Sequence, residues 1–515
     1  MYNTEQAYEK FMKEIDCGRI TYATSNELYL LMQEKYPGEK SALAEELYGA
    51  VGKGIYFDIY LYSYILKLSP QIKYLNAMLE LIMNSDSLNW QQLYFLFYQI
   101  TSCIFMNSVL NVYETVSMNW KLQQKALSMC AKELDLDLKH IPEEERNENI
   151  AVVITEQFLS VQHGPTKTAL DRCYVLQKKL NKRVFLINTA ELLPGIGEVP
   201  FYNRSCGNYL LELLDETTVS WQGETFQYYQ CENVMPDIEE MTLLLNTIIR
   251  LKPSIVVCIG GSSLFAGLVN YMIPVLTVGT IQSGLATTLA DYQVIDDNMI
   301  EHVKPLLKLM DKDMSHIIPG RFTFSLKNQT EHLKREDVGI DKDAFVMAVV
   351  GGRLDDEITD EFLNMLEMVI SDNMLIAVIG KCDSFDNKLS RHPKLDGHMI
   401  NMGFCRDILS RLELCDLYIN PTRRGGGTSV VEAMSKGKPA VTVNYGDVAG
   451  IVGDTFSCKD YAEMGRLIKR YHLDKEFYEE QSKQALRMAE EYLDTENEFA
   501  RIVHVYEDKI KGEKA

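Results

Sequence analysis

The sequence has few of the features that mark membrane, disulfide-linked or nucleic-acid-binding proteins. Its most apolar run, residues 93–106, is shorter than the roughly 20 residues that a transmembrane helix needs. The charged residues 1–18 have no apolar segment of the kind found in signal peptides. The eleven cysteines form no Cys-x-x-Cys pair, which favours reduced thiols. The net charge of −21 argues against broad binding to nucleic acid or anionic lipid. We expect a cytoplasmic protein in which any anionic ligand binds at a locally positive site, with no transmembrane segment and no nucleic acid partner.

Several motifs of common enzyme classes are also missing. There is no G-x-x-x-x-G-K-[ST] phosphate loop, no complete G-x-G-x-x-G and no G-x-S-x-G nucleophile turn. Asp-x-Asp pairs occur at 135–137, 311–313 and 341–343, but all three lie in polar connecting stretches. Such pairs arise by chance in a chain with 73 acidic residues. We therefore expect no metal site and no cofactor.

The pattern of apolar residues divides the chain into parts. Up to about residue 140, apolar residues recur every three or four positions, as in amphipathic helices. After the polar stretch 139–150, short β-branched runs alternate with intervals of helix length, which is typical of parallel α/β sheets. The fold class is predicted to be α/β, with two Rossmann-like domains facing a cleft behind an all-α N-terminal domain. The predicted parts are an all-helical domain (1–145), a first Rossmann-like domain (146–330), a second Rossmann-like domain (331–475) and C-terminal helices that pack back on the core (476–515).

Nine runs are predicted to be strands of the two sheets. Open α/β sheets bind ligands at the carboxyl ends of their strands, so the residues after these runs are candidates for a site. The predicted strands are 150–155, 183–188, 254–260 and 274–279 in the first sheet, and 345–351, 375–380, 398–403, 417–421 and 440–443 in the second.

One stretch, "NPTRRGGGTSVVEAMSKGKPAVTV" (420–443), has the order strand, Gly-rich turn and helix. Glycines in such a turn let a ligand approach the free N–H groups at the start of the helix. Glu432, one turn into the helix, is suited to accept hydrogen bonds from two vicinal hydroxyls. A helix start that binds phosphate, next to a carboxylate that binds the hydroxyls of a ribose, indicates a nucleotide site. The other interpretation, an ordinary turn with solvated arginines, accounts less well for this order. The candidate residues here are Arg423, Arg424, Gly425, Gly426, Gly427, Thr428, Ser429 and Glu432.

Residues 345–450 resemble the nucleotide-sugar-binding half of GT-B glycosyltransferases, through "VVGGRLDDE", "VIGK", "GFCRDILSRLELCDLYINP" and the Gly-rich stretch. The resemblance implies that the loop and helix start bind a diphosphate, Glu432 binds ribose, and Arg353 and Lys381 contact the phosphates. It also implies a UDP-sugar as donor. Two positions depart from the pattern. Arg424 replaces a glutamate that contacts the donor sugar in many retaining members, and Ile358 replaces a common lysine. Retention or inversion of configuration therefore stays open.

The first Rossmann-like domain gives weaker signals. "VQHGPTK" places His163 and Lys167 after the first strand, and with the helical domain it resembles bacterial cytoplasmic N-glucosyltransferases. That resemblance implies that His163 lines the active site, whereas a histidine in such a turn is as often structural. Lys167, Gln282 and Ser283 are acceptor or cleft candidates by position. "GGSS" (260–263) either presents N–H groups to a ligand or packs a strand against a helix.

The sequence thus predicts a metal-independent glycosyltransferase that moves a sugar from a nucleotide-diphosphate donor to a protein, peptide or glycan acceptor. Two alternatives remain: a sugar-nucleotide epimerase of the same fold, and a non-catalytic GT-B partner subunit that stabilises an active transferase. The helical domain has three possible roles, which are self-association or contact with a partner subunit, binding of a protein acceptor, and bracing of the core.

Overall fold

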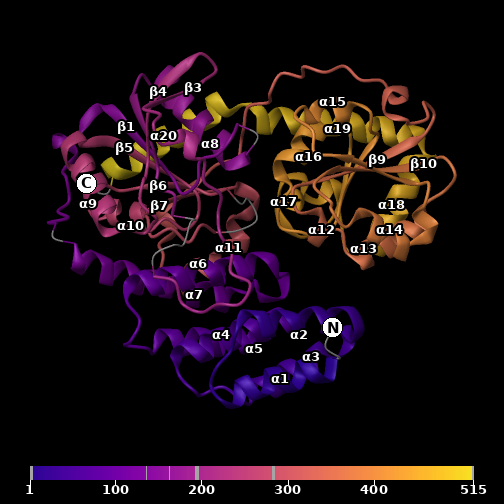
Figure 1. Ribbon diagram of the computed structural model, residues 1–515. Helices are drawn as coiled ribbons and strands as arrows, with labels where there is room; N and C mark the ends of the chain where they lie inside the picture. Colours follow the sequence, from indigo (N-terminus) through magenta and orange to yellow (C-terminus); the bar gives the residue numbers. More distant parts are fainter. Residues whose placement is uncertain (1–3, 135, 162, 192–196, 281–284, 513–515) are drawn as a thin grey trace.

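The computed structural model describes residues 4–134, 136–161, 163–191, 197–280 and 285–512. They form two α/β domains side by side, with a helical domain beneath them (Figure 1). No helix in these ranges is long and apolar enough to cross a membrane.

Residues 4–133, the described part of the helical domain, form seven α-helices. The longest pair, α6 and α7, lies between the remaining helices and the first α/β domain (Figure 1). A capping box fixes the start of α6: Asn89 Oδ1 accepts from the Gln92 N–H, and Gln92 Oε1 accepts from the Asn89 N–H. The helices are α1 (Thr4–Asp16), α2 (Tyr22–Lys35), α3 (Lys40–Tyr48), α4 (Ile55–Leu68), α5 (Ile72–Met83), α6 (Trp90–Met106) and α7 (Tyr113–Glu133).

The first α/β domain contains an eight-stranded sheet in the order β3-β4-β2-β1-β5-β6-β7-β8, in which only β3 pairs antiparallel with its neighbour. Its strands are β1 (Asn147–Thr155), β2 (Arg183–Asn188), β3 (Thr218–Trp221), β4 (Glu224–Gln230), β5 (Pro253–Ile259), β6 (Leu276–Val278), β7 (Tyr292–Ile295) and β8 (Ile317–Pro319). Its helices are α8 (Gly164–Tyr174), α9 (Ile238–Leu251), α10 (Leu264–Asn270) and α11 (Ile300–Leu309).

The second α/β domain has a six-stranded parallel sheet in the order β11-β10-β9-β12-β13-β14. Its strands are β9 (Phe345–Gly351), β10 (Met374–Gly380), β11 (Met399–Gly403), β12 (Leu417–Asn420), β13 (Ala440–Val443) and β14 (Ser457–Cys458). Its helices are α12 (Leu354–Glu357), α13 (Asp360–Val369), α14 (Phe385–Arg391), α15 (Ile408–Glu413), α16 (Gly427–Met434), α17 (Gly446–Phe456) and α18 (Tyr461–Leu473).

The chain then returns to the first α/β domain. Helix α19 (Lys475–Leu493) packs on α16, and α20 (Thr495–Gly512) crosses back to the first sheet (Figure 1). There Phe499, Val503 and Tyr506 are fully buried in the core beneath that sheet. The C-terminal helices therefore tie the two α/β domains together.

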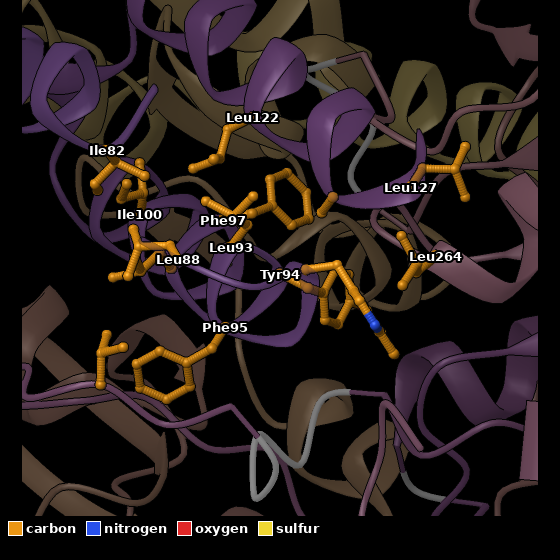
Figure 2. Close-up of a cluster of buried hydrophobic side chains, with 14 of the residues drawn as sticks. Ile82, Leu88, Leu93, Tyr94, Phe95, Phe97, Ile100, Leu122, Leu127 and Leu264 are labelled. Atoms are coloured by element: carbon orange, nitrogen blue, oxygen red, sulfur yellow. The ribbon is translucent and has the colours of Figure 1, made fainter. Parts of the chain in front are cut away.

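One continuous core joins the helical domain to the first α/β domain. Phe95, Phe97 and Leu127 of the helical domain belong to the same buried cluster as Leu264 of α10 (Figure 2). Val256 of β5 belongs to this cluster too. Because the two parts share a core, α6 and α7 are held in a fixed position beside the first sheet. Of the three roles open for the helical domain, bracing of the core is the one that this packing supports.

All nine predicted strands are present, with ends that differ by two residues or fewer except at the first, which begins earlier, at Asn147. Five strands were not predicted. The hairpin β3–β4 turns at Gln222 and Gly223, which both have positive φ. The strands β7, β8 and β14 have four residues or fewer, and all five strands lie at or next to an edge of a sheet, where the continuous apolar run that marks a buried strand is weak.

Candidate active site

The Gly-rich stretch lies between β12 and α16, as predicted. Gly426 is the N-cap of α16, with φ at +109°, and a Cβ at this position would lie 2.8 Å from Arg423 Nη2. Glycine is therefore required here by conformation and by space. No side chain caps the start of α16, so its first N–H groups are available to an anion. Ser429 Oγ instead contacts Tyr418 Oη, at 2.8 Å, and the Gly426 carbonyl.

Arg423 does not contribute charge to a ligand site, contrary to prediction. Its side chain is buried, and it donates to the Val350 carbonyl at 2.6 Å and to Asn420 Oδ1 at 2.8 Å. Its ion pair with Glu357 Oε2 measures 2.6 Å. These bonds occupy the guanidinium, so Arg423 fixes the turn from within. This role could not be predicted, because Glu357 lies 66 residues away in the sequence.

A second helix start faces the first across the cleft. His163 is the N-cap of α8, and no side chain caps this helix either. A Cβ placed on Gly164 would lie 3.9 Å from Thr428 Oγ1 of α16. The starts of the two helices, where each helix dipole is positive, therefore lie close together. That arrangement suits a negatively charged group between the two domains.

Glu432 is linked to the opposite domain by an ion pair. Its Oε1 lies 3.4 Å from Lys167 Nζ of α8, and the two side chains are 11% and 7% exposed. Burial raises the pKa of Glu432, while Lys167 and the nearby Lys327 favour its ionised form. Lys167 also lies over the ring of Phe324, 5.2 Å from its centroid. Lys167 therefore lies between the two α/β domains and contacts Glu432, the residue predicted to bind ribose.

His163 is held by the first turn of its own helix. Its Nδ1 lies 3.0 Å from Thr166 Oγ1, and Thr166 Oγ1 also accepts from the Leu159 N–H at 2.8 Å. Burial lowers the pKa of His163 to about 4, so the imidazole is neutral near pH 7. In the tautomer that donates from Nδ1 to Thr166, Nε2 is a proton acceptor.

Arg353 and Arg424 come together on an aromatic residue of the helical domain. Their guanidinium carbons lie 5.3 and 5.5 Å from the ring centroid of Phe105, which belongs to α6. Arg353 also pairs with Glu357 at 3.2 Å. Arg424 has a buried Nε without a hydrogen-bond partner, and burial lowers its pKa. Phe105 is a site residue that nothing in the sequence indicated, because a lone aromatic on a helix resembles any core position.

Other predicted site residues are not linked to the Gly-rich loop by hydrogen bonds or ion pairs among the described residues. Lys381 follows β10, has a side chain 67% exposed and pairs with Asp383 at 3.1 Å. Among the described residues no hydrogen bond or ion pair joins Lys381 to the Gly-rich loop. Gln282 and Ser283 lie outside the described residues. Within the described ranges, no group of three or more His, Cys, Asp or Glu side chains is placed to hold a metal ion.

The N–H groups of the "GGSS" turn bind carboxylates of the protein itself. Glu156 accepts from the Gly261 and Ser262 N–H groups, at 3.1 and 2.5 Å, and from Ser262 Oγ at 2.9 Å. Glu191 accepts from the N–H groups of Leu264 and Phe265, at 2.8 and 2.9 Å. Burial, with Glu191 nearby, raises the pKa of Glu156 to about 7. This turn is therefore not a phosphate site, and the packing interpretation of it is correct.

The second α/β domain is similar to a known protein family. Residues 346–474 match the family model of glycosyl transferases group 1. No curated protein matches the sequence.

Solved structures with low identity share the fold. A glycosyltransferase from Rickettsia africae has a TM-score of 0.52 at 11% identity, covering 71% of this chain and all of the other. HepE of Anabaena in complex with UDP has a TM-score of 0.51 at 12% identity, over 70% of this chain and all of its own. An O-GlcNAc transferase mutant from Thermobaculum terrenum has a TM-score of 0.51 at 12% identity, over 99% of this chain and 98% of its own. The predicted architecture of two Rossmann-like domains behind a helical domain is confirmed.

Proposed function

We propose that this chain is a glycosyltransferase of the GT-B fold and that it moves a sugar from a UDP-sugar to an acceptor in the cleft between its two Rossmann-like domains. The observation that carries the proposal is the pair of uncapped helix starts, α8 and α16, that face each other beside Glu432. UDP as the nucleotide is supported by the UDP complex of HepE.

The diphosphate would lie between the two helix starts. Backbone N–H groups of residues 427–429, the helix dipoles and Arg353 would stabilise its charge. Lys381, exposed at the end of β10, would reach the same anion by moving its flexible side chain. Glu432 would accept hydrogen bonds from the ribose hydroxyls, in place of or alongside Lys167.

The transfer itself is a substitution at the anomeric carbon of the sugar. The acceptor atom forms a bond to this carbon as the bond from the carbon to the diphosphate oxygen breaks, and UDP leaves with the electron pair. The proton of the acceptor passes to a base, for which we propose Nε2 of the neutral His163. The helix starts and cations stabilise the charge that grows on UDP, so we propose that the reaction needs no metal ion.

The proposed compartment is the cytosol. All eleven cysteines are free thiols, as expected where thiols remain reduced.

A screen of nucleotide sugars tests this function. Nucleotides that bind raise the melting temperature by mass action, and we expect UDP and UDP-sugars to do so more than the guanosine and adenosine equivalents. Turnover of the best UDP-sugar, measured with and without candidate acceptors, separates a transferase from an epimerase. Turnover that does not depend on any acceptor and yields an epimeric UDP-sugar would contradict the proposal.

A further inference from the structure

Two adjoining cavities lie where the three parts of the chain meet. The inner cavity, about 270 Å³, is lined by Tyr98 and Phe105 of α6, by Glu156 and by the loops after β5 and β6. The outer cavity, about 780 Å³, is lined by the start of α7, by α11 and by α17. Val116, Leu285 and Arg424 line both cavities. The outer cavity therefore leads toward the inner one past Arg424.

The outer cavity is separate from the proposed nucleotide site. Arg424 is the only residue of the 424–432 stretch among the described residues that line it. Its volume lies within the range of about 300–1,000 Å³ that is usual for ligand sites. It opens beside the residue that precedes the Gly-rich turn, so an acceptor bound here would lie next to the donor.

The helical domain supplies one wall of this cavity. Asn111, Val112, Tyr113 and Glu114 line it from the turn before α7 and from the first turn of that helix. The hydroxyl of Tyr113 donates to the His302 carbonyl of α11 at 2.7 Å, which fixes the two helices together. Because α7 also shares a core with the first Rossmann-like domain, this wall is preorganised.

We propose that the outer cavity binds a polypeptide acceptor, with the helical domain as one wall of the acceptor site. This inference rests on the proposed function and adds the class of acceptor to it. The lining carries a group of apolar side chains from the start of α7 and the residue before it, from the short 3-10 helix η6 (Asp297–Met299) and from α11, namely Val112, Val116, Met299, Val303 and Leu306. Apolar side chains of a peptide bury surface against such a group, whereas a glycan would place hydroxyls there.

The polar lining also fits a peptide. Asn111, Asn298 and Asn444 line the cavity from three different segments of the chain. Each amide side chain has both a hydrogen-bond donor and an acceptor, which is what the N–H and C=O groups of an extended peptide backbone require.

The charges at the outer cavity favour a neutral or basic peptide. Glu114 and Asp454 are exposed on different walls, one from α7 and one from α17. No lysine occurs among the described residues that line the cavity, and Arg424 lies at its inner end. A peptide with lysines beside the accepting residue would therefore be attracted, and one with glutamates repelled.

The test uses the full-length protein, a UDP-sugar that binds it, and two sets of acceptors. The first set is short synthetic peptides with a central Ser, Thr or Asn, an apolar neighbour, and flanks of either Lys or Glu. The second set is oligosaccharides and aryl glycosides. We expect transfer to Lys-flanked peptides, with a lower KM than for the Glu-flanked ones.

Reversing the charge of Glu114 and Asp454, the exposed acidic residues at the rim of the outer cavity, tests the expected preference for Lys-flanked peptides. Glu114→Lys combined with Asp454→Lys should raise the KM for Lys-flanked peptides about five- to tenfold and lower it for Glu-flanked peptides, because the sign of the rim changes. Both residues are exposed, so the fold should be unaffected. The affinity for UDP and kcat should stay the same. Glu490→Lys, at an exposed position of α19, is the control and should change none of these values.

The outcomes separate this inference from the proposed function. If UDP binds and sugar passes only to the glycan set, or to no peptide at all, the peptide assignment is wrong while the nucleotide site stands. An unchanged KM for both peptide classes in the double variant would also overturn it. If UDP does not bind to the wild-type protein, the proposed function itself fails.

Discussion

Replacement of Lys167 by Met tests the contact between the two Rossmann-like domains. The Lys167 Nζ to Glu432 Oε1 distance is 3.4 Å, and both side chains are buried, with 7% of Lys167 and 11% of Glu432 exposed. At an effective dielectric constant of about 20, the attraction between the two charges is roughly 5 kcal/mol. Removal of one partner from a buried pair costs about 3–5 kcal/mol. Because Lys327 also acts on Glu432, we expect a loss near the lower end, about 3 kcal/mol.

The loss should depend on pH in a defined direction. Burial already raises the pKa of Glu432, and loss of Lys167 would raise it further. The folded protein would then keep the Glu432 proton after the unfolded chain has released it. The variant should therefore be close to wild type below about pH 4, where the carboxyl group is protonated in both states. Its deficit should grow as the pH rises toward the folded-state pKa, and level off above it.

Scanning calorimetry at pH 5 and pH 8 measures this effect. Lys167→Met should melt several degrees below wild type at pH 8 and show a smaller difference at pH 5, since a domain of this size shifts about 2–4 °C per kcal/mol. Lys167→Met combined with Glu432→Gln should recover most of the loss, because no buried charge is left unpaired. The control is Lys178→Met, which removes an exposed pair with Glu224 worth under about 1 kcal/mol. Equal melting of Lys167→Met and wild type at pH 8 would show that the Lys167–Glu432 pair does not stabilise the fold.

Further outcomes are expected for His163, for Glu156 and for metal removal. His163→Ala should lower the transfer rate about 10²- to 10⁴-fold with little change in UDP affinity, and a variant that melts lower but transfers at the wild-type rate would show a structural role only. Because the pKa of His163 is lowered to about 4, the rate should show no titration of this group between pH 5.5 and 8. The pKa of Glu156 is raised to about 7, so the folded state keeps this proton to higher pH than the unfolded state does, and stability falls as the pH rises from about 4.5 to 7. In Glu156→Gln part of this fall in melting temperature should be absent. A variant with the same pH profile of melting as wild type would contradict this. Transfer should persist in EDTA at the wild-type rate, and abolition by EDTA with recovery on addition of Mn²⁺ or Mg²⁺ would show that a metal stabilises the leaving group.

The central strands of both sheets could be predicted because they are β-branched runs buried on both faces. β2, β9 and β13 were predicted to the residue. The order of strand, Gly-rich turn and helix at 420–437 also follows from sequence, since Gly426 has a conformation that glycine alone adopts easily. Short edge strands such as β3 lack enough alternation to be recognised.

Contacts between distant segments could not be predicted. Lys167 and Glu432 are 265 positions apart, so nothing in either local pattern shows that they meet. The same holds for Phe105, which lies against Arg353 and Arg424, and for the use of the 260–263 turn by Glu156 and Glu191. The identities of the base and of the acceptor stay predictions, as does the resemblance of the first Rossmann-like domain to N-glucosyltransferases.

We propose that Glu432 binds the ribose of a nucleotide whose diphosphate lies at the start of α16. Titration calorimetry with UDP and with its 2′,3′-dideoxy analogue measures the contribution of the two hydroxyls directly. Wild-type protein should bind UDP about tenfold to a hundredfold more tightly than the analogue, because a hydrogen bond to a charged group contributes about 1.5–3 kcal/mol. In Glu432→Gln most of this difference should disappear, while the exposed control Glu490→Gln should keep it. A folded Glu432→Gln variant that still distinguishes UDP from the dideoxy analogue as strongly as wild type would contradict the account.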